Sequence, residues 1–150
     1  MCLLVIVLLT EINAICNSKN NILSIASGTS FGRCITYCHR SINITSNPYE
    51  LFALKEPNFA QTQYPSAQQQ YPISSDEWQK LISLIDSKIF QALDDTIGCP
   101  DCADGGAEWI QINWLNKNKQ VTFEYEKFIQ GFEGLINELR SLRDKYVNNL

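Results

Sequence analysis

Positive charge is scarce in this chain of 150 residues, in which 12 lysines and arginines stand against 16 aspartates and glutamates. The formal net charge is -4. Without a cationic excess, the chain has no basic field that could condense onto a phosphate backbone or an anionic bilayer. The composition therefore argues against nucleic acid and anionic membrane surfaces as partners.

Motifs of the common enzyme classes are also missing. The sequence contains no glycine-flanked serine elbow and no phosphate-cradling glycine loop. His39 is the only histidine, and on a regular strand it would point away from its neighbour Cys38. Asp94 and Asp95 fit a polar helix end better than a catalytic carboxylate pair. These absences favour a protein that is not an enzyme and that needs no cofactor.

No apolar run reaches the roughly 20 residues that cross a bilayer as a helix. Residues 3–9 are all aliphatic, and this length suits the hydrophobic region of a secretory signal. Ala14 and Cys16 offer a cleavage site after Cys16. We therefore expect a signal peptide over residues 1–16, a secreted protein of residues 17–150, and no membrane span after cleavage. A buried amino-terminal strand and a lipoprotein signal at Cys16 are the alternatives.

Hydrophobic residues make up 45% of the chain and aromatic residues 11%, which is enough for one folded domain. Ser74 and Glu77 form a capping-box pattern that opens a helix, whose apolar stripe consists of Trp78, Leu81, Ile82, Ile85 and Ile89 and which closes before Gly98. A second apolar stripe predicts a helix over 132–146. Extended segments are predicted at 22–26, 33–45, 49–55, 110–114 and 121–125. The order β-β-β-α-β-β-α predicts an α+β fold, a small antiparallel sheet with two helices packed on one face.

Two of these segments have unusual composition. In residues 33–45 neither face is apolar throughout, which favours a bend around residues 38–40. Residues 56–74 contain three prolines and five glutamines, a composition typical of a long surface loop. Such a loop is either a contact surface or a mobile polar insertion.

Four cysteines remain after the predicted cleavage: Cys34, Cys38, Cys99 and Cys102. An even number of cysteines in an oxidising compartment predicts disulfides. Residues four apart in a regular strand are separated by about 13 Å, so Cys34 and Cys38 can pair only if the chain bends between them. Otherwise they would cross-link to Cys99 and Cys102. The sequence leaves all three connectivities open.

Two other functions for these thiols are a zinc site and a thiol-disulfide oxidoreductase centred on Cys99 and Cys102. The unequal spacings and the oxidising route disfavour zinc. The acidic segment after Cys102 offers no cation that would activate a thiolate.

Two further short patterns suggest sites. Asp101, Asp104 and Glu108 flank a glycine pair and fit either a calcium loop or a glycine turn with solvated carboxylates. Asn43 begins an Asn-Ile-Thr acceptor sequence for N-glycosylation.

The blocks SFGRCITYC at residues 30–38 and GCPDCADGGAEW at 98–109 resemble a group of uncharacterised small secreted proteins. They are also distantly similar to a bacterial domain of unknown function that opens with a Cys-Phe-Gly-x-Cys-Pro-x-Tyr strand. This chain departs from that pattern at Ser30 and Thr36, so a disulfide from the first position is absent. The resemblance implies a shared α+β fold and export, and no activity.

Together these features predict a secreted, disulfide-stabilised module that acts by binding or as a structural element. The segments 99–109 and 56–74 are its candidate contact surfaces. Its partner would be a protein or a small-molecule ligand.

Overall fold

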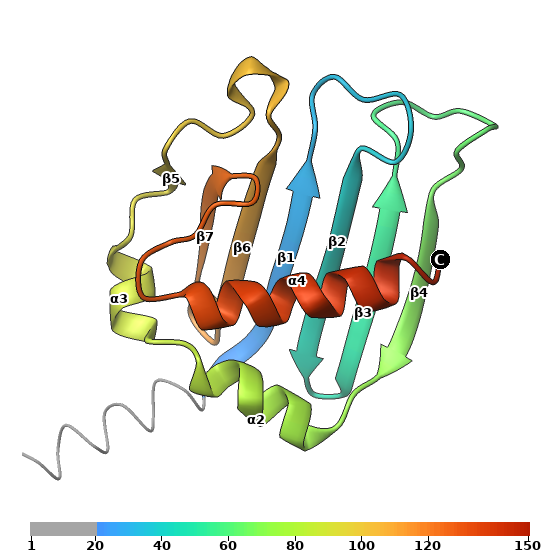
Figure 1. The fold of residues 1–150 in the computed structure, drawn as a ribbon. Coiled ribbons are helices and arrows are strands. Elements are labelled where there is room, and N and C mark those ends of the chain that lie inside the picture. Colours follow the sequence, from blue (N-terminus) through green and yellow to red (C-terminus); the bar gives the residue numbers. More distant parts are fainter. Residues whose placement is uncertain (1–20) are drawn as a thin grey trace, which may run out of the picture.

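The computed structural model describes residues 21–150, so the predicted signal peptide lies outside the described residues. A seven-stranded sheet in the order β4-β3-β2-β1-β6-β7-β5 dominates the fold (Figure 1). The strands are β1 (Ile22–Ser30), β2 (His39–Ser46), β3 (Tyr49–Glu56), β4 (Ala67–Pro72), β5 (Thr96–Ile97), β6 (Ala107–Trp114) and β7 (Lys117–Glu124). Neighbouring strands are antiparallel except β5, which runs parallel to β7.

The helices are α2 (Ser75–Ser83), α3 (Ser87–Ala92) and α4 (Glu133–Val147). Figure 1 shows α4 crossing one face of the sheet, with α2 and α3 at the end where β2 meets β3. The loops β1–β2, β3–β4 and β5–β6 gather at the opposite end. This end is called the loop end below.

One hydrophobic core lies between the sheet and the helices. Alternation along β6 turns Ile110, Ile112 and Trp114 towards the helices, and the register places Ile112 beside Ile25 of β1. Buried side chains of the three helices form the other side of this core: Trp78, Leu81, Phe90, Leu135 and Leu139. The other face of the sheet therefore has no helix packed on it among the described residues.

The predicted fold class is wrong in strand number and in helix number. A small antiparallel sheet with two helices was expected, whereas the sheet is mixed and has seven strands, and there are three helices. The extra strand β4 lies inside the predicted loop 56–74, because its backbone pairs with β3 from Lys55 to Glu50. Pairing of this kind at a sheet edge depends on backbone hydrogen bonds, so it does not require the alternation of apolar and polar residues from which strands are predicted.

The first predicted helix is also divided. Asp86 accepts a hydrogen bond from the backbone N–H of Ile89 at 3.0 Å and so begins a new helix, α3. The break turns Ile89 out of the predicted apolar stripe, and its side chain is 53% exposed.

The predicted strand 33–45 begins only at His39, and the residues before it form the β1–β2 loop. In place of the bend expected around residues 38–40, the chain leaves the sheet altogether before His39, where β2 begins. None of the described helices is long and apolar enough to cross a membrane.

Candidate functional site: a groove beside α4

The four cysteines form two local disulfides. Cys34 pairs with Cys38 and Cys99 pairs with Cys102, each across a Cα–Cα distance of 5.5 Å. The first bridge is possible because the chain turns between its two cysteines, as the distance argument required. Of the connectivities left open, the cross-link of Cys34 and Cys38 to Cys99 and Cys102 is not the one formed, because neither bridge joins the two loops.

Asp101 joins these two loops without a covalent bond. Its Oδ1 accepts hydrogen bonds from the backbone N–H of Gly106 at 3.1 Å and of Gly32 at 3.5 Å. Arg33 and Asp104 add an exposed ion pair at 3.5 Å. The two sequence blocks at residues 30–38 and 98–109 are therefore in contact at the loop end.

Phe31 fixes the same junction by packing. Its ring meets the Tyr125 ring edge-on at a centroid distance of 4.9 Å. A Cβ on Gly106 would lie only 2.3 Å from this ring, and Gly106 has a φ of +83°. Glycine is thus required at this position both for space and for backbone conformation.

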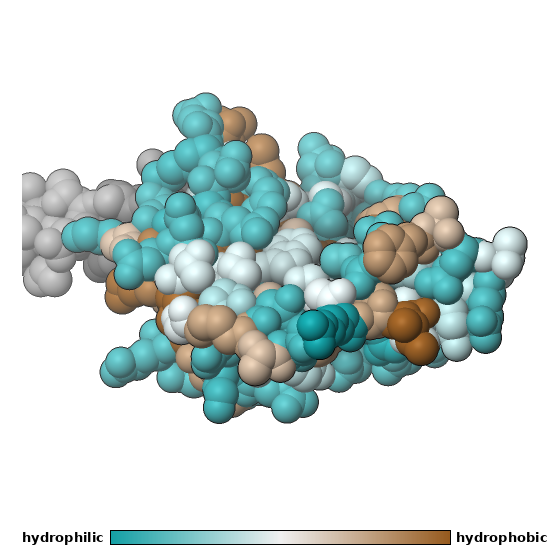
Figure 2. Space-filling view, turned by 90° about the horizontal axis from the view of Figure 1, so that it is seen from above, coloured by the Kyte–Doolittle hydropathy of each residue, from teal (hydrophilic) through white to brown (hydrophobic). Residues whose placement is uncertain are grey.

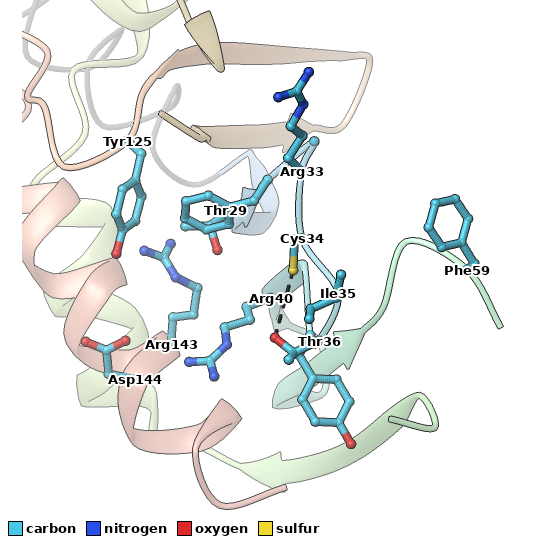
Figure 3. A pocket seen from close by; sticks show the side chains of 13 residues that line it. Thr29, Arg33, Cys34, Ile35, Thr36, Arg40, Phe59, Tyr125, Arg143 and Asp144 are labelled. Carbon is cyan, nitrogen blue, oxygen red and sulfur yellow. Dashed lines mark hydrogen bonds between the residues drawn. The ribbon is translucent and has the colours of Figure 1, made fainter. Parts of the chain in front are cut away.

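A groove of about 820 Å³ opens between the β1–β2 loop and the carboxyl-terminal half of α4. Its charged lining residues are Arg33, Arg40, Arg143 and Asp144. In Figure 3 Arg40 and Arg143 enter the space between helix and loop, whereas Arg33 points away from them. Phe31, Ile35, Tyr37, Phe59 and Tyr125 supply apolar and aromatic surface.

A buried ionic cluster lies beside this groove. Glu108 is 1% exposed, and both of its oxygens accept hydrogen bonds from Arg140 at 2.7 to 3.1 Å. Arg143 donates to the same carboxylate at 2.9 Å and to the hydroxyl of Ser27 at 2.9 Å. A buried charge is tolerated only when it is paired and hydrogen-bonded, and here one carboxylate neutralises one of two guanidinium groups.

Arg40 extends the excess of positive charge. It lies opposite Thr29, which in turn lies opposite Glu108, so the three residues form one row across β2, β1 and β6. Its Nη1 donates to the neutral side-chain oxygen of Asn148 at 3.1 Å. No carboxylate among residues 21–150 forms an ion pair with Arg40. Three arginines, Arg40, Arg140 and Arg143, thus lie near three carboxylates, Glu108, Glu126 and Asp144, of which only Glu108 forms ion pairs with them.

Tyr125 adds a polar group to the wall of the groove. Burial raises the pKa of its phenol above the ordinary value of 10.0, and the neighbouring Glu126 carboxylate raises it further. The hydroxyl therefore stays protonated at neutral pH and can donate a hydrogen bond. Figure 3 shows this hydroxyl directed towards Arg143 and Asp144.

The surface of the loop end is mainly hydrophilic and is interrupted by hydrophobic side chains on the right of Figure 2. Ile35, 84% exposed, and Phe59, 75% exposed, belong to the two loops on that side. Phe59 lies in the segment 56–74, one of the two predicted contact surfaces.

The three carboxylates considered as an alternative calcium loop do not converge. Asp101 caps backbone N–H groups, Asp104 pairs with Arg33, and Glu108 is buried under α4, so the calcium-loop interpretation is wrong. Within residues 21–150 no three His, Cys, Asp or Glu side chains form a group that could hold a metal ion.

Sequence reasoning missed the arginines of the groove. Two signals were nevertheless present. Glu108 stands in phase with the inward residues Ile110 and Ile112 of β6, and Arg143 follows the buried Leu139 by four residues on α4. A charge in phase with core residues on two separate elements indicates a buried ion pair.

Comparison with known proteins gives no relative: no family model matches the chain, and no curated protein is similar to it.

Proposed function

We propose that this protein is an exported binding module whose groove holds an organic anion, such as a carboxylate with an apolar body. The observation that carries the proposal is Arg40, a partly buried cation in the groove with no carboxylate partner among the described residues. Guanidinium groups bind carboxylates in a planar, bidentate geometry.

The apolar lining supports an amphiphilic ligand rather than an inorganic ion. Binding sites for small molecules combine mainly apolar walls with a few polar groups that fix orientation. Here Phe31 and Tyr125 would contact the body of the ligand, while Arg40 and the Tyr125 hydroxyl would bind its acidic end. Because the whole chain carries a net charge of -4, this local positive charge gives selectivity for anions at one place on the surface.

Export is supported by the cysteines. Disulfides persist in oxidising compartments, and both pairs described here are bridged. Secretion itself remains a prediction based on residues 1–16.

The test is titration calorimetry with a panel of aryl and alkyl carboxylates, each paired with its uncharged amide. We expect the acids alone to bind. Arg40→Gln should weaken that binding about tenfold or more, since a hydrogen bond to a charged group contributes about 1.5–3 kcal/mol.

Arg33→Gln is the matched control, because Arg33 also lines the groove but is paired with Asp104 and points away from Arg40 and Arg143 (Figure 3). The proposal fails if no acid binds, if the amides bind equally well, or if both variants lose affinity to the same degree. Thermal melting of each variant shows that the fold is intact.

A second candidate function is thiol-disulfide exchange at Cys99 and Cys102. The observation in its favour is that both cysteines are exposed, so the bridge is accessible to a thiolate. Reduction of insulin disulfides, with dithiothreitol as electron donor, would be lost in Cys99→Ser and kept in Cys34→Ser. Absence of turnover in the unaltered protein would exclude this candidate.

A further inference from the structure

The face of the sheet opposite the helices, called the open face, has an unusual composition. Two adjacent rows of outward residues cross six strands: Gln70, Phe52, Asn43, Ala26, Gln111 and Gln120 in one, and Gln68, Leu54, Ser41, Gly28, Trp109 and Thr122 in the other. None of these side chains is charged, although 19% of the chain is. The centre of the open face is therefore an uncharged surface of amides, hydroxyls and aromatic rings, whereas Glu50 and Glu56 of β3 lie in the rows on either side of it.

Trp109 forms a platform on this face. A Cβ added to Gly28 would lie 2.6 to 2.8 Å from three atoms of the indole, so the ring rests directly against the backbone of β1. The absence of a side chain at Gly28 is what allows the ring to lie there. None of the described residues accepts a hydrogen bond from the indole N–H, and the residue is only partly buried.

Asn43 occupies the centre of the same face. It is the only exposed residue of β2, and its neighbours across the sheet are Phe52 on one side and the small Ala26 on the other. No hydrogen bond joins its side-chain amide to any residue in the described part of the chain. Asn43 also begins the Asn-Ile-Thr acceptor sequence.

We propose that Asn43 carries an N-linked glycan that lies across the open face. The new bond joins Nδ2 of Asn43 to the anomeric carbon of a lipid-linked oligosaccharide pyrophosphate. The amide loses a proton and the donor loses its lipid pyrophosphate, so no oxidant or reductant is needed. The proposal rests on the export proposed above, because the donor belongs to the secretory route.

The surroundings of Asn43 match the surface of a sugar. The C–H faces of a pyranose ring are apolar and pack on aromatic rings, here Phe52 beside Asn43 and the indole of Trp109 diagonally across β1. Its hydroxyls can donate to the side-chain carbonyl oxygens of Gln70 and Gln111 in the same row, whose amide nitrogens already donate to Glu50 and Asn113. The glycan would thus cover a face on which no helix packs in the described structure.

Thr45 indicates when the transfer occurs. In the folded protein its hydroxyl donates to the backbone carbonyl of Pro48 at 2.7 Å, within the turn between β2 and β3. The acceptor sequence needs this hydroxyl free, so the sugar is added before the β2–β3 hairpin forms.

The first measurement is the intact mass of the full chain secreted by a eukaryotic cell, before and after treatment with a peptide:N-glycanase. We expect one glycan on the unaltered protein, none on Asn43→Gln, and retention on Thr45→Ser, which keeps the acceptor hydroxyl. A secreted protein without sugar at Asn43 would overturn the proposal.

If the chain is not secreted at all, the proposed export fails, and a foreign leader replacing residues 1–16 then tests Asn43 separately.

The second measurement asks whether the sugar lies on the open face. Trp78 and Trp114 are 4% and 5% exposed, so acrylamide quenching of tryptophan fluorescence reports mainly on Trp109. Removal of the glycan should raise the quenching constant, because a ring covered by sugar then becomes accessible to the quencher. Trp109→Phe should abolish this difference. An equal quenching constant with and without the sugar would show a glycan that projects into solvent.

Discussion

At the scale of single residues, Gly106 decides how the two loops of the groove meet. Its positive φ and its contact with the Phe31 ring both exclude a side chain. We expect Gly106→Ala to lower the free energy of unfolding by about 2–4 kcal/mol, from a left-handed backbone of about 1 kcal/mol and overpacking of about 1–3 kcal/mol. Urea denaturation measures this change.

Gly131 provides the control for that substitution. It has a similar φ of +85°, but nothing lies within 4 Å of a Cβ built on it. Gly131→Ala should therefore lower the free energy of unfolding by only about 1 kcal/mol, which is the contribution of the left-handed backbone alone. Equal losses in the two variants would show that contact with Phe31 is unimportant.

The predicted site residues had mixed outcomes at this scale. The cysteines could be recognised because their number and spacing are local properties of the sequence. Arg40 could not, because what makes it a candidate is the lack of a carboxylate nearby, and its neighbours come from Thr29, Asn148 and Asp144 on other elements.

At the scale of elements, the start of α2 is the clearest success of sequence reasoning. Glu77 Oε2 accepts from the backbone N–H of Ser74 at 2.8 Å, and the hydroxyl of Ser74 accepts from the backbone N–H of Glu77 at 3.1 Å. The capping box predicted from the sequence is confirmed.

These bonds give α2 a pH dependence. The backbone hydrogen bond from Ser74 is the main reason that the pKa of Glu77 lies below its ordinary value of 4.5. The stabilisation is therefore complete above pH 4.5 and is lost as the pH falls through the lowered pKa.

Glu77→Gln should accordingly reduce stability at pH 7, by less than about 1 kcal/mol because the carboxylate is largely exposed. The difference from the unaltered protein should shrink below pH 4. Urea denaturation at several pH values measures it, and Asp76→Asn is the control, since Asp76 lies in the same turn. If the stability difference between Glu77→Gln and the unaltered protein stays the same at low pH, the ionised Glu77 carboxylate does not stabilise the start of α2.

Other elements were harder to predict because their partners decide them. The glutamines of β4 have low strand propensity, and only the free edge of β3 draws them into the sheet. The same applies to β5, whose two residues pair with Thr122 and Phe123.

At the scale of the whole molecule, the two disulfides should act separately. Each closes a short loop, with sequence separations of 4 and 3, so the loss of either should cost about 2 kcal/mol on the chain-entropy model. We expect Cys99→Ser with Cys102→Ser to lower thermal stability and leave anion affinity unchanged, because these residues do not line the groove.

Cys34→Ser with Cys38→Ser should have a second effect. This bridge holds the β1–β2 loop that forms one wall of the groove, and Cys34 lines it. Anion affinity should fall together with the melting temperature. Melting curves and calorimetry on both double variants test the difference, and a loss of affinity in the Cys99 pair alone would contradict it.

The sequence by itself determined what depends on neighbours along the chain: the alternation of β6 and β7, the cap of α2, the apolar stripe of α4 and the even set of cysteines. Tertiary structure decided the rest. The broken helix, the added strand β4 and the row of Thr29, Arg40 and Glu108 arise from pairing between distant segments. Burial beneath α4 removes Glu108 from water, so this carboxylate must find its partners within the protein, whereas Arg40 at the edge of the groove stays without a carboxylate partner among the described residues.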